Sequence, residues 1–275
     1  MDQSSFHLAD GTSRVSPREL NGFDEQSVRG VDTAAAIGLL DRLLAGPPGS
    51  AAEDLKAIRL TASQRDRLLA AVYERTFGPR IESTVRCTNC REAVDVTFPL
   101  EDLLVAFSGA ASSPTADALP DGTFRLPNGL RFRLPTGEDE TAVAGLSPEE
   151  AEREMLERCV IERESGVDPN SVREATVQDA AVQEAMEEVA PVLDLDLHGR
   201  CPECGAEQSV HFDMQFYLLR AIEQERKQMG REVHRLAIAY GWSLNEILGL
   251  FRSERRAFVE LIDADLSVRR RSQWS

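Results

Sequence analysis

Four of the five cysteines fall into two identical Cys-x-x-Cys turns that lie far apart in the chain. Cys87 and Cys90 form the first turn, and Cys201 and Cys204 form the second, so residues 91–200, 110 in all, separate them. A structural zinc site takes four Cys or His ligands in a tetrahedron, and each turn supplies two thiolates at a suitable separation. We therefore expect all four cysteines to bind one zinc ion, with residues 91–200 leaving the turns and returning to them.

Two other interpretations of these turns stay open at this stage. They could be unrelated reduced turns without a metal, or one could be a redox-active pair. Neither turn opens a helix directly after a strand, which is the arrangement that lowers a thiol pKa for redox chemistry. Four thiolates would also fill the zinc shell and leave no position for water or substrate, so the site is expected to be structural. The fifth cysteine, Cys159, is expected to be a small buried residue of a helix.

The segments around the two turns repeat one another. Strands are expected over residues 81–86 and 93–98 around the first turn, and the second turn is flanked by Leu197 on one side and Val210 and Phe212 on the other. Each unit then enters a helix. A weaker echo compares residues 6–25 with 124–140, where a hairpin precedes an acidic helix start in both.

Local patterns elsewhere predict mainly helices. Hydrophobic spacing, capping residues and breakers place them over residues 24–45, 61–78, 99–107, 147–164, 177–189, 214–240, 243–250 and 253–262. The last helix is expected to bury Phe258, Leu261 and Ile262. Residues 109–120 are predicted to form a loop, and residues 124–134 a hairpin that turns at Asn128 and Gly129.

These elements predict an α+β fold, mostly helical, with a small antiparallel zinc-ribbon-like sheet built from the two Cys-x-x-Cys hairpins. Residues 1–50 would form an N-terminal hairpin and helix that end in the Gly/Pro linker Gly46–Ser50. Residues 51–213 would form the zinc-ribbon-like core with a large helical insertion at about 99–192. Residues 214–275 would form a C-terminal helical region.

The charge of the chain excludes several classes of partner. The formal net charge is -16 and the sequence pI is about 4.8, so nucleic-acid phosphates and anionic lipid heads repel it. The basic run Arg269–Arg271 is expected to be a solvated end. The sequence contains no apolar stretch that could span a membrane and no secretory signal at Met1. We expect a cytoplasmic location, no membrane contact and no nucleic-acid partner.

Motifs that carry catalysis are missing from the sequence. It contains no GxSxG, HExxH, P-loop or GxGxxG pattern, and its four histidines are not spaced as a catalytic pair. His198 and His211 flank the second Cys-x-x-Cys turn and are expected on a strand face or at the surface. We therefore expect no catalytic residues, no small-molecule substrate and no enzymatic activity.

Several stretches in a fixed order carry a family resemblance. They are Leu60–Leu69, Thr76–Ile81, the first Cys-x-x-Cys turn, Phe132–Asp139, Leu156–Cys159, the second turn, Glu232–His234, Tyr240–Ser243 and Glu246–Leu248. Together they resemble the T-even phage baseplate protein family of contractile-tailed phages and phage-derived contractile injection systems. The resemblance covers roughly residues 55 to 265.

The resemblance implies a non-enzymatic structural or assembly component of a baseplate or its hub. Its partners would be other baseplate, hub or tail-tube proteins, met in the cytoplasm and kept in the virion or injection-system baseplate if the protein is retained. Tyr240 and Trp242 are the candidate partner-binding residues, although Trp242 could instead belong to the core. The alternative function is a zinc-ribbon regulatory or nucleic-acid-associated protein. Charges around the two turns are nearly balanced, which argues against that alternative.

Overall fold

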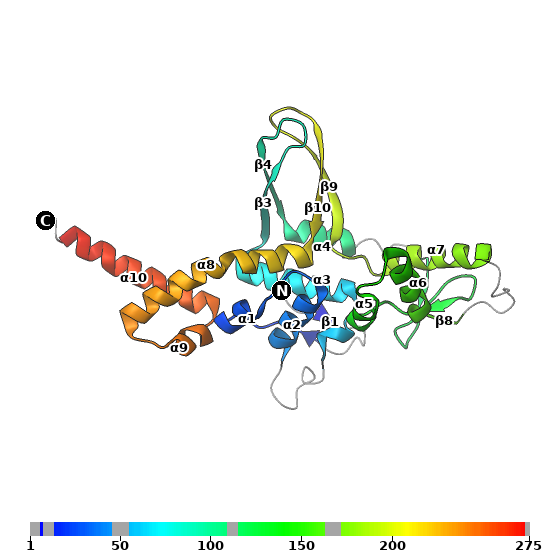
Figure 1. The fold of residues 1–275 in the computed structure, drawn as a ribbon, viewed down its shortest axis with the longest axis horizontal. Coiled ribbons are helices and arrows are strands. Elements are labelled where there is room, and N and C mark those ends of the chain that lie inside the picture. The colour runs from blue at the N-terminus through cyan, green and yellow to red at the C-terminus, as the bar shows by residue number, and fades with distance from the viewer. Residues whose placement is uncertain (1–5, 8–13, 46–54, 109–114, 163–171, 273–275) are drawn as a thin grey trace.

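The computed structural model describes residues 6–7, 14–45, 55–108, 115–162 and 172–272. Helices make up 56% of it and the strands form small antiparallel sheets, which confirms the expected α+β class. The molecule is a long row of helices from which two hairpins project to one side (Figure 1). No helix of the described residues is long and apolar enough to cross a membrane.

The centre of the row holds the larger hydrophobic core. Helices α2 (Thr33–Leu44), α3 (Ala62–Phe77) and the first half of α8 (Met214–Tyr240) bury leucines against one another there. The single helix expected over residues 24–45 is wrong, because the segment forms α1 (Gly22–Ser27) and α2. Gly30 adopts a φ of 94° between them, and Asp32 caps α2 by accepting from the Ala35 N–H.

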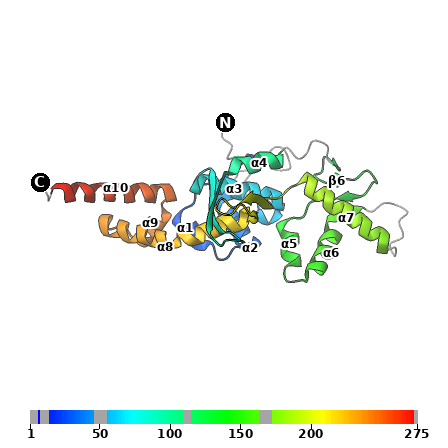
Figure 2. The same ribbon diagram turned by 90° about the horizontal axis from the view of Figure 1, so that it is seen from above.

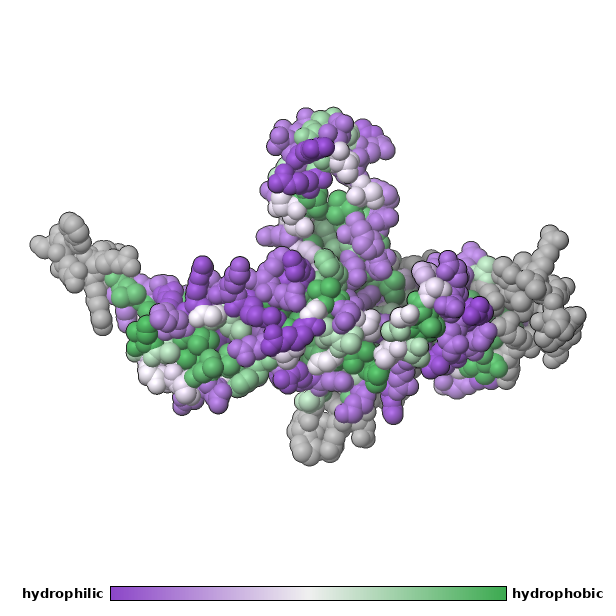
Figure 3. Space-filling view, viewed as in Figure 1, coloured by the Kyte–Doolittle hydropathy of each residue, from purple (hydrophilic) through white to green (hydrophobic). Residues whose placement is uncertain are grey.

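The two hairpins, here called the tower, consist of β3 (Arg80–Arg86) with β4 (Ala93–Pro99) and β9 (Asp194–Arg200) with β10 (Glu207–Asp213). Their side chains alternate between exposed and more buried positions, as strands with one covered face require. Hydrophobic residues lie between the hairpins and hydrophilic ones cover their outer sides (Figure 3). Backbone hydrogen bonds join strands only within each hairpin, so the tower is two facing sheets.

A second, smaller core lies at one end of the row. It is built by α6 (Pro148–Cys159), α7 (Val172–Val189) and a four-stranded sheet, and α5 (Gly137–Val143) contacts both α6 and α2. Helix α4 (Leu100–Ser108) connects the tower to this part of the chain. The sheet has the order β5 (Asp117–Ala118), β6 (Phe124–Arg125), β7 (Arg131–Phe132) and β8 (Val160–Glu162).

The hairpin expected over residues 124–134 is confirmed as β6 and β7, but three nearby expectations need correction. The helix expected over 147–164 ends at Cys159, because Val160 to Glu162 pair with β7 as a strand. The loop expected over 109–120 contains β5 among its described residues. Helix α7 begins at Val172 rather than at residue 177. The expected linker Gly46–Ser50 lies outside the described residues.

The other end of the row is an arm, residues 228–272, made of the second half of α8, α9 (Leu244–Gly249) and α10 (Arg252–Ser272). Gly241 ends α8 in the left-handed conformation, and Ser243 with Glu246 forms the expected capping box of α9. Helix α10 is twice as long as the expected 253–262. It projects past the rest of the row (Figure 2), and Leu261, expected to be buried, is 57% exposed.

Both sequence echoes belong to one larger repeat of the element order. Helices α1 and α2 recur as α5 and α6 at an offset of 115 residues (137 minus 22, and 148 minus 33). Strands β3 and β4 recur as β9 and β10 at an offset of 114 (194 minus 80, and 207 minus 93). The hairpin β1 (Phe6–His7) and β2 (Arg14–Val15) precedes α1 as β6 and β7 precede α5.

Candidate metal centre

The two Cys-x-x-Cys turns meet at the tip of the tower. The same backbone bond closes each hairpin, since the Cys87 N–H donates to the Glu92 carbonyl and the Cys201 N–H to the Ala206 carbonyl, both at 2.9 Å. Cys87 and Cys201 are buried where the turns face each other. Two segments far apart in the chain thus meet at the tip of the tower (Figure 1), and their sulfurs share one small volume.

Both turns need one residue in the left-handed conformation directly after the second cysteine. Arg91 has a φ of 64° and Gly205 a φ of 71°. The N–H of each donates back to the carbonyl of the first cysteine of its turn, at 3.0 Å for Arg91 and 2.9 Å for Gly205. Glycine adopts this conformation without strain, whereas arginine does so at a cost that the turn imposes.

The four sulfurs have the spacing of a tetrahedral metal site. Cys87 Sγ lies 3.7 Å from Cys204 Sγ, and Cys90 Sγ lies 3.8 Å from Cys201 Sγ. All four lie within 4.8 Å of one another. A zinc–sulfur bond of about 2.3 Å implies sulfurs about 3.8 Å apart at the corners of a regular tetrahedron. The sulfurs are too far apart for a disulfide, which needs about 2.05 Å. The donor set therefore fits a zinc ion.

Amide donors point at two of these sulfurs. The backbone N–H groups of Asn89 and Cys90 donate to Cys87 Sγ at 3.4 and 3.5 Å, and the Asn89 side-chain amide donates to Cys204 Sγ at 3.5 Å. Donation from the Cys90 N–H, followed by that from Asn89, lowers the pKa of Cys87. Donation from the Asn89 side chain lowers the pKa of Cys204 to about 6. Both shifts favour the thiolate, which is the form that binds metal.

Cys90 shows why a cation suits this site. The Glu92 N–H donates to its sulfur and lowers its pKa. Desolvation and the neighbouring thiols of Cys87, Cys204 and Cys201 together outweigh this effect and raise the pKa of Cys90 to about 12. Four thiolates confined to one small volume repel one another, so the four thiols cannot all ionise without a positive charge among them. A divalent cation in the middle of the four sulfurs would remove that repulsion.

Contacts between the hairpins hold the turns in place. The Thr88 N–H of the first turn donates to the side-chain oxygen of Gln208 on β10 at 2.9 Å. Lower in the tower, the rings of Phe98 and Phe212 pack edge to face with centroids 5.7 Å apart. The body of the tower therefore positions the sulfurs from both sides.

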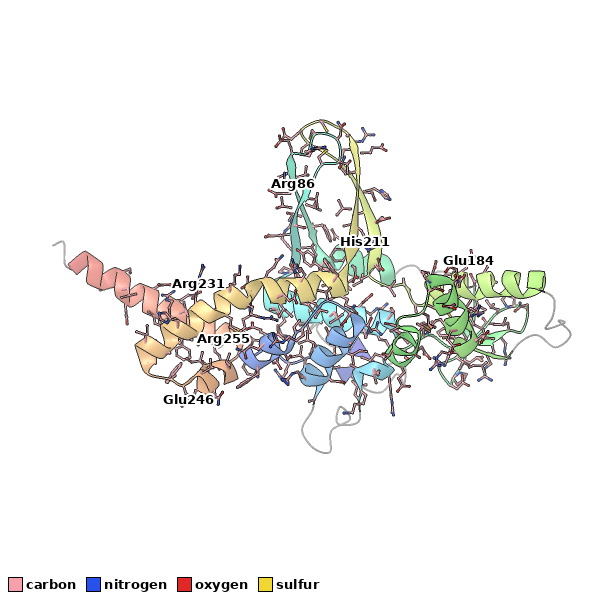
Figure 4. All side chains as sticks on the ribbon, in the orientation of Figure 1. Arg86, Glu184, His211, Arg231, Glu246 and Arg255 are labelled. Atoms are coloured by element: carbon pink, nitrogen blue, oxygen red, sulfur yellow. The ribbon has the colours of Figure 1, made fainter. Side chains whose placement is uncertain are left out.

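The remaining candidate residues lie apart from the four sulfurs. His198 is exposed on β9, and His211 lies on the outer face of β10 near the base of the tower (Figure 4), with Nε2 3.2 Å from Asp194 Oδ1. Cys159 is fully buried on α6, and this burial raises the pKa of its thiol to about 11, as expected for a core cysteine. Asn89 was missed, although a polar residue inside a Cys-x-x-Cys turn is a sequence feature that suggests such a donor.

The two candidate partner-binding residues lie together on the arm. The Tyr240 ring stacks on Trp242 at a centroid distance of 4.8 Å, and Trp242 packs edge to face on Phe258 of α10 at 5.0 Å. Tyr240 is 41% exposed, whereas Trp242 is partly covered. The three rings form an aromatic patch that is packed on one side and open to solvent on the other.

A family model described as the T4 bacteriophage base plate protein matches residues 48–216. The match includes both Cys-x-x-Cys turns, the tower and the smaller core. Neither a comparison with curated proteins nor one with solved structures gives a match.

Proposed function

Since the family model matches more than half of its 275 residues, the chain belongs to the T4 bacteriophage base plate protein family, and we propose that it is a non-enzymatic structural or assembly component of a contractile tail-like baseplate or its hub. It would act through protein–protein contacts with other baseplate, hub or tail-tube proteins. Those contacts would form in the cytoplasm. If the protein stays in the assembled particle, it would be part of the virion or injection-system baseplate.

We further propose that Cys87, Cys90, Cys201 and Cys204 bind one structural zinc ion. The sulfur separations of 3.7 and 3.8 Å are the single observation that carries this assignment. Zinc would tie together two hairpins that 110 residues separate, so that metal binding contributes directly to folding. The ion would leave no open coordination position, which agrees with a role in architecture.

Tyr240 and Trp242 are proposed to contact a partner. An aromatic cluster that is rigid on one side and open on the other has the composition and packing of an interface anchor. The division into residues 1–50, 51–213 and 214–275 stays a prediction.

A zinc-ribbon regulator that binds nucleic acid is less well supported. The basic side chains near the turns have acceptors beside them, since Arg200 Nη2 lies 3.5 Å from Glu207 Oε1 and Arg86 donates to the Arg91 carbonyl at 3.4 Å. A nucleic-acid surface needs cations free to meet phosphates. A gel shift that weakens with salt would favour this alternative.

The test is capture of partners by the full chain, with zinc measured on the same sample. We expect tail-tube, hub or other baseplate proteins to copurify with about one zinc per chain, as the four-thiolate shell requires. Trp242→Ala should lower capture and keep the zinc, whereas the matched control Phe216→Ala, which removes an exposed aromatic ring far from the arm, should capture normally. A zinc-free chain that captures none of these proteins would overturn the proposal.

A further inference from the structure

One pattern occurs twice in the chain and begins a short helix each time. Arg18, Asn21, Gly22, Asp24 and Glu25 precede and open α1, and five residues at an offset of 115 do the same for α5. These are Arg133, Thr136, Gly137, Asp139 and Glu140. In both copies the arginine holds the aspartate with two hydrogen bonds, at 2.6 and 2.9 Å in the first and 2.6 and 2.8 Å in the second.

Each copy docks on the first turn of another helix. Thr136 forms an antiparallel bridge with Thr61, the N-cap of α3, and Asn21 forms one with Phe251, the residue before α10. The two receiving residues are themselves equivalent. The N–H of Thr61 donates to the Gln64 side chain at 3.0 Å, and the N–H of Phe251 donates to Glu254 at 2.8 Å.

The glycine of each copy touches the backbone of the receiving segment. A methyl group on Gly22 would lie 2.9 Å from Leu248 Cα, and one on Gly137 would lie 2.9 Å from the Ile58 carbonyl oxygen. Leu248 lies three residues before Phe251, and Ile58 lies three residues before Thr61. Only glycine permits this approach of two backbones, so the contact geometry is the same in both places.

A buried arginine completes each contact. Arg65, four residues after Thr61, donates through Nη2 to both Glu140 oxygens at 2.8 Å. Arg255, four residues after Phe251, donates through Nη2 to Glu25 Oε2. We name the contact around Arg65 and Glu140 the first lock and the contact around Arg255 and Glu25 the second lock.

The second lock is the more completely paired of the two. Arg252 Nη1 also donates to Glu25 at 2.7 Å, and Arg255 Nε donates to Glu232 of α8 at 3.3 Å. Among the described residues, Arg65 Nε and Nη1 of the first lock are buried without a partner, and in the second lock Arg252 Nε is. Buried charges that pair with one another fix a unique geometry more than they add stability, because any other arrangement leaves a charge unpaired.

The second lock joins the arm to the rest of the molecule. Arg255 lies where α8, α10 and α1 come together (Figure 4). It is one turn before Phe258 on α10, and Glu232 is two turns before Tyr240 on α8. The residues that lock the arm and those that carry its aromatic patch therefore share two short stretches of helix.

We propose that Glu25 is a positioning residue, which holds the arm through the second lock so that the aromatic patch of Tyr240, Trp242 and Phe258 meets a baseplate protein in one orientation. The proposal rests on the proposed function and names what controls that surface. Glu25 itself is 3% exposed and cannot contact a partner, so it acts only through Arg252 and Arg255.

Glu25→Gln tests the proposal in the full, zinc-loaded chain, and Glu140→Gln in the first lock is the matched control. Amide hydrogen exchange reports the arm, metal content reports the tower, and capture of baseplate proteins reports the patch. We expect Glu25→Gln to raise exchange at least tenfold in residues 228–262, leave residues 62–99 and the zinc unchanged, and lower capture at least tenfold. Glu25→Asp keeps the charge and should restore part of the capture. Glu140→Gln should leave the arm and capture unchanged.

Unchanged exchange in the arm of Glu25→Gln would overturn the proposal. So would raised exchange in the arm with normal capture, because the lock would then hold the arm without positioning the patch. Loss of zinc together with exchange everywhere would assign Glu25 to global folding instead. If the unmodified chain captures no baseplate protein, the proposed function fails, and the exchange data still decide whether Glu25 holds the arm.

Discussion

Replacing Asp66 by asparagine should remove the contribution that this buried carboxyl makes to the pH dependence of stability between pH 5 and pH 8. Asp66 lies on α3 and is 9% exposed, and its Oδ2 accepts the Leu193 N–H at 2.7 Å where the chain enters β9. Desolvation is the main cause that raises the pKa of this carboxyl, from 3.8 to about 7, against the lowering effect of the Leu193 hydrogen bond. Asparagine keeps an oxygen that can accept the same hydrogen bond.

The sign of the effect follows from proton binding. Between pH 3.8 and pH 7 the folded protein binds more protons at Asp66 than the unfolded chain, so the free energy of unfolding falls as pH rises and levels off above pH 7. Each unit of pKa difference corresponds to about 1.4 kcal/mol. Integrated from pH 5 to pH 8, Asp66 should lower the stability of the unmodified protein by about 3 kcal/mol.

Urea unfolding at pH 5, 6, 7 and 8, with zinc in constant excess, measures this directly. The difference in stability between Asp66→Asn and the unmodified protein should grow by about 3 kcal/mol from pH 5 to pH 8 in favour of the variant, because the cost of ionising a buried carboxyl is gone. Any effect of pH on the metal site is common to both proteins and cancels in their difference. Asp102→Asn, which changes an exposed carboxylate of α4, is the control and should follow the unmodified protein. Parallel curves for Asp66→Asn and the unmodified protein would refute the reasoning.

Two further predictions concern the tower and the locks. Cys90→Ser and Cys204→Ser should each lose the zinc and raise amide exchange in β3, β4, β9 and β10, whereas Cys159→Ala should keep the full metal content; zinc retained by both serine variants would contradict the proposed ligands. Gly137→Ala should lower the free energy of unfolding in urea by about 1 to 3 kcal/mol, because its methyl group meets the Ile58 backbone. Gly230→Ala, at a helical position of α8 with open space around it, should raise stability by up to about 1 kcal/mol, and equal effects of the two glycine changes would exclude the steric explanation.

Local sequence patterns were sufficient for the tower and for most helix starts. Strand, Cys-x-x-Cys turn and strand are contiguous in each hairpin, so their alternation is visible without knowledge of the rest of the chain. The capping boxes at Thr61, Ser147 and Ser243 are also complete within four residues, and all three open helices as expected.

Errors arose where distant segments decide the outcome. Residues 160–162 leave the helical pattern because β7 offers a strand to pair with. Leu261 lies on an exposed side of α10, and the local pattern does not tell which side of that helix α8 covers. The second lock joins Glu25 to Arg255 across 230 positions, and no local pattern pairs those two residues. The weak echo between residues 6–25 and 124–140 is the sequence feature that relates to the locks, since it contains Glu25 of the second lock and Glu140 of the first.

The span of the second lock has a consequence for the order in which the chain is made. The chain leaves the ribosome N-terminus first, so Glu25 emerges long before Arg252 and Arg255, which follow it by 227 and 230 residues. Contacts between such distant positions close late because a long loop must first be ordered. The carboxylate of Glu25 therefore stays in water until α10 has been made. A prematurely terminated chain could build the central core and the tower, yet would leave that carboxylate unmatched and lack the arm's last helix. Closure of the second lock thus requires that synthesis has passed α10.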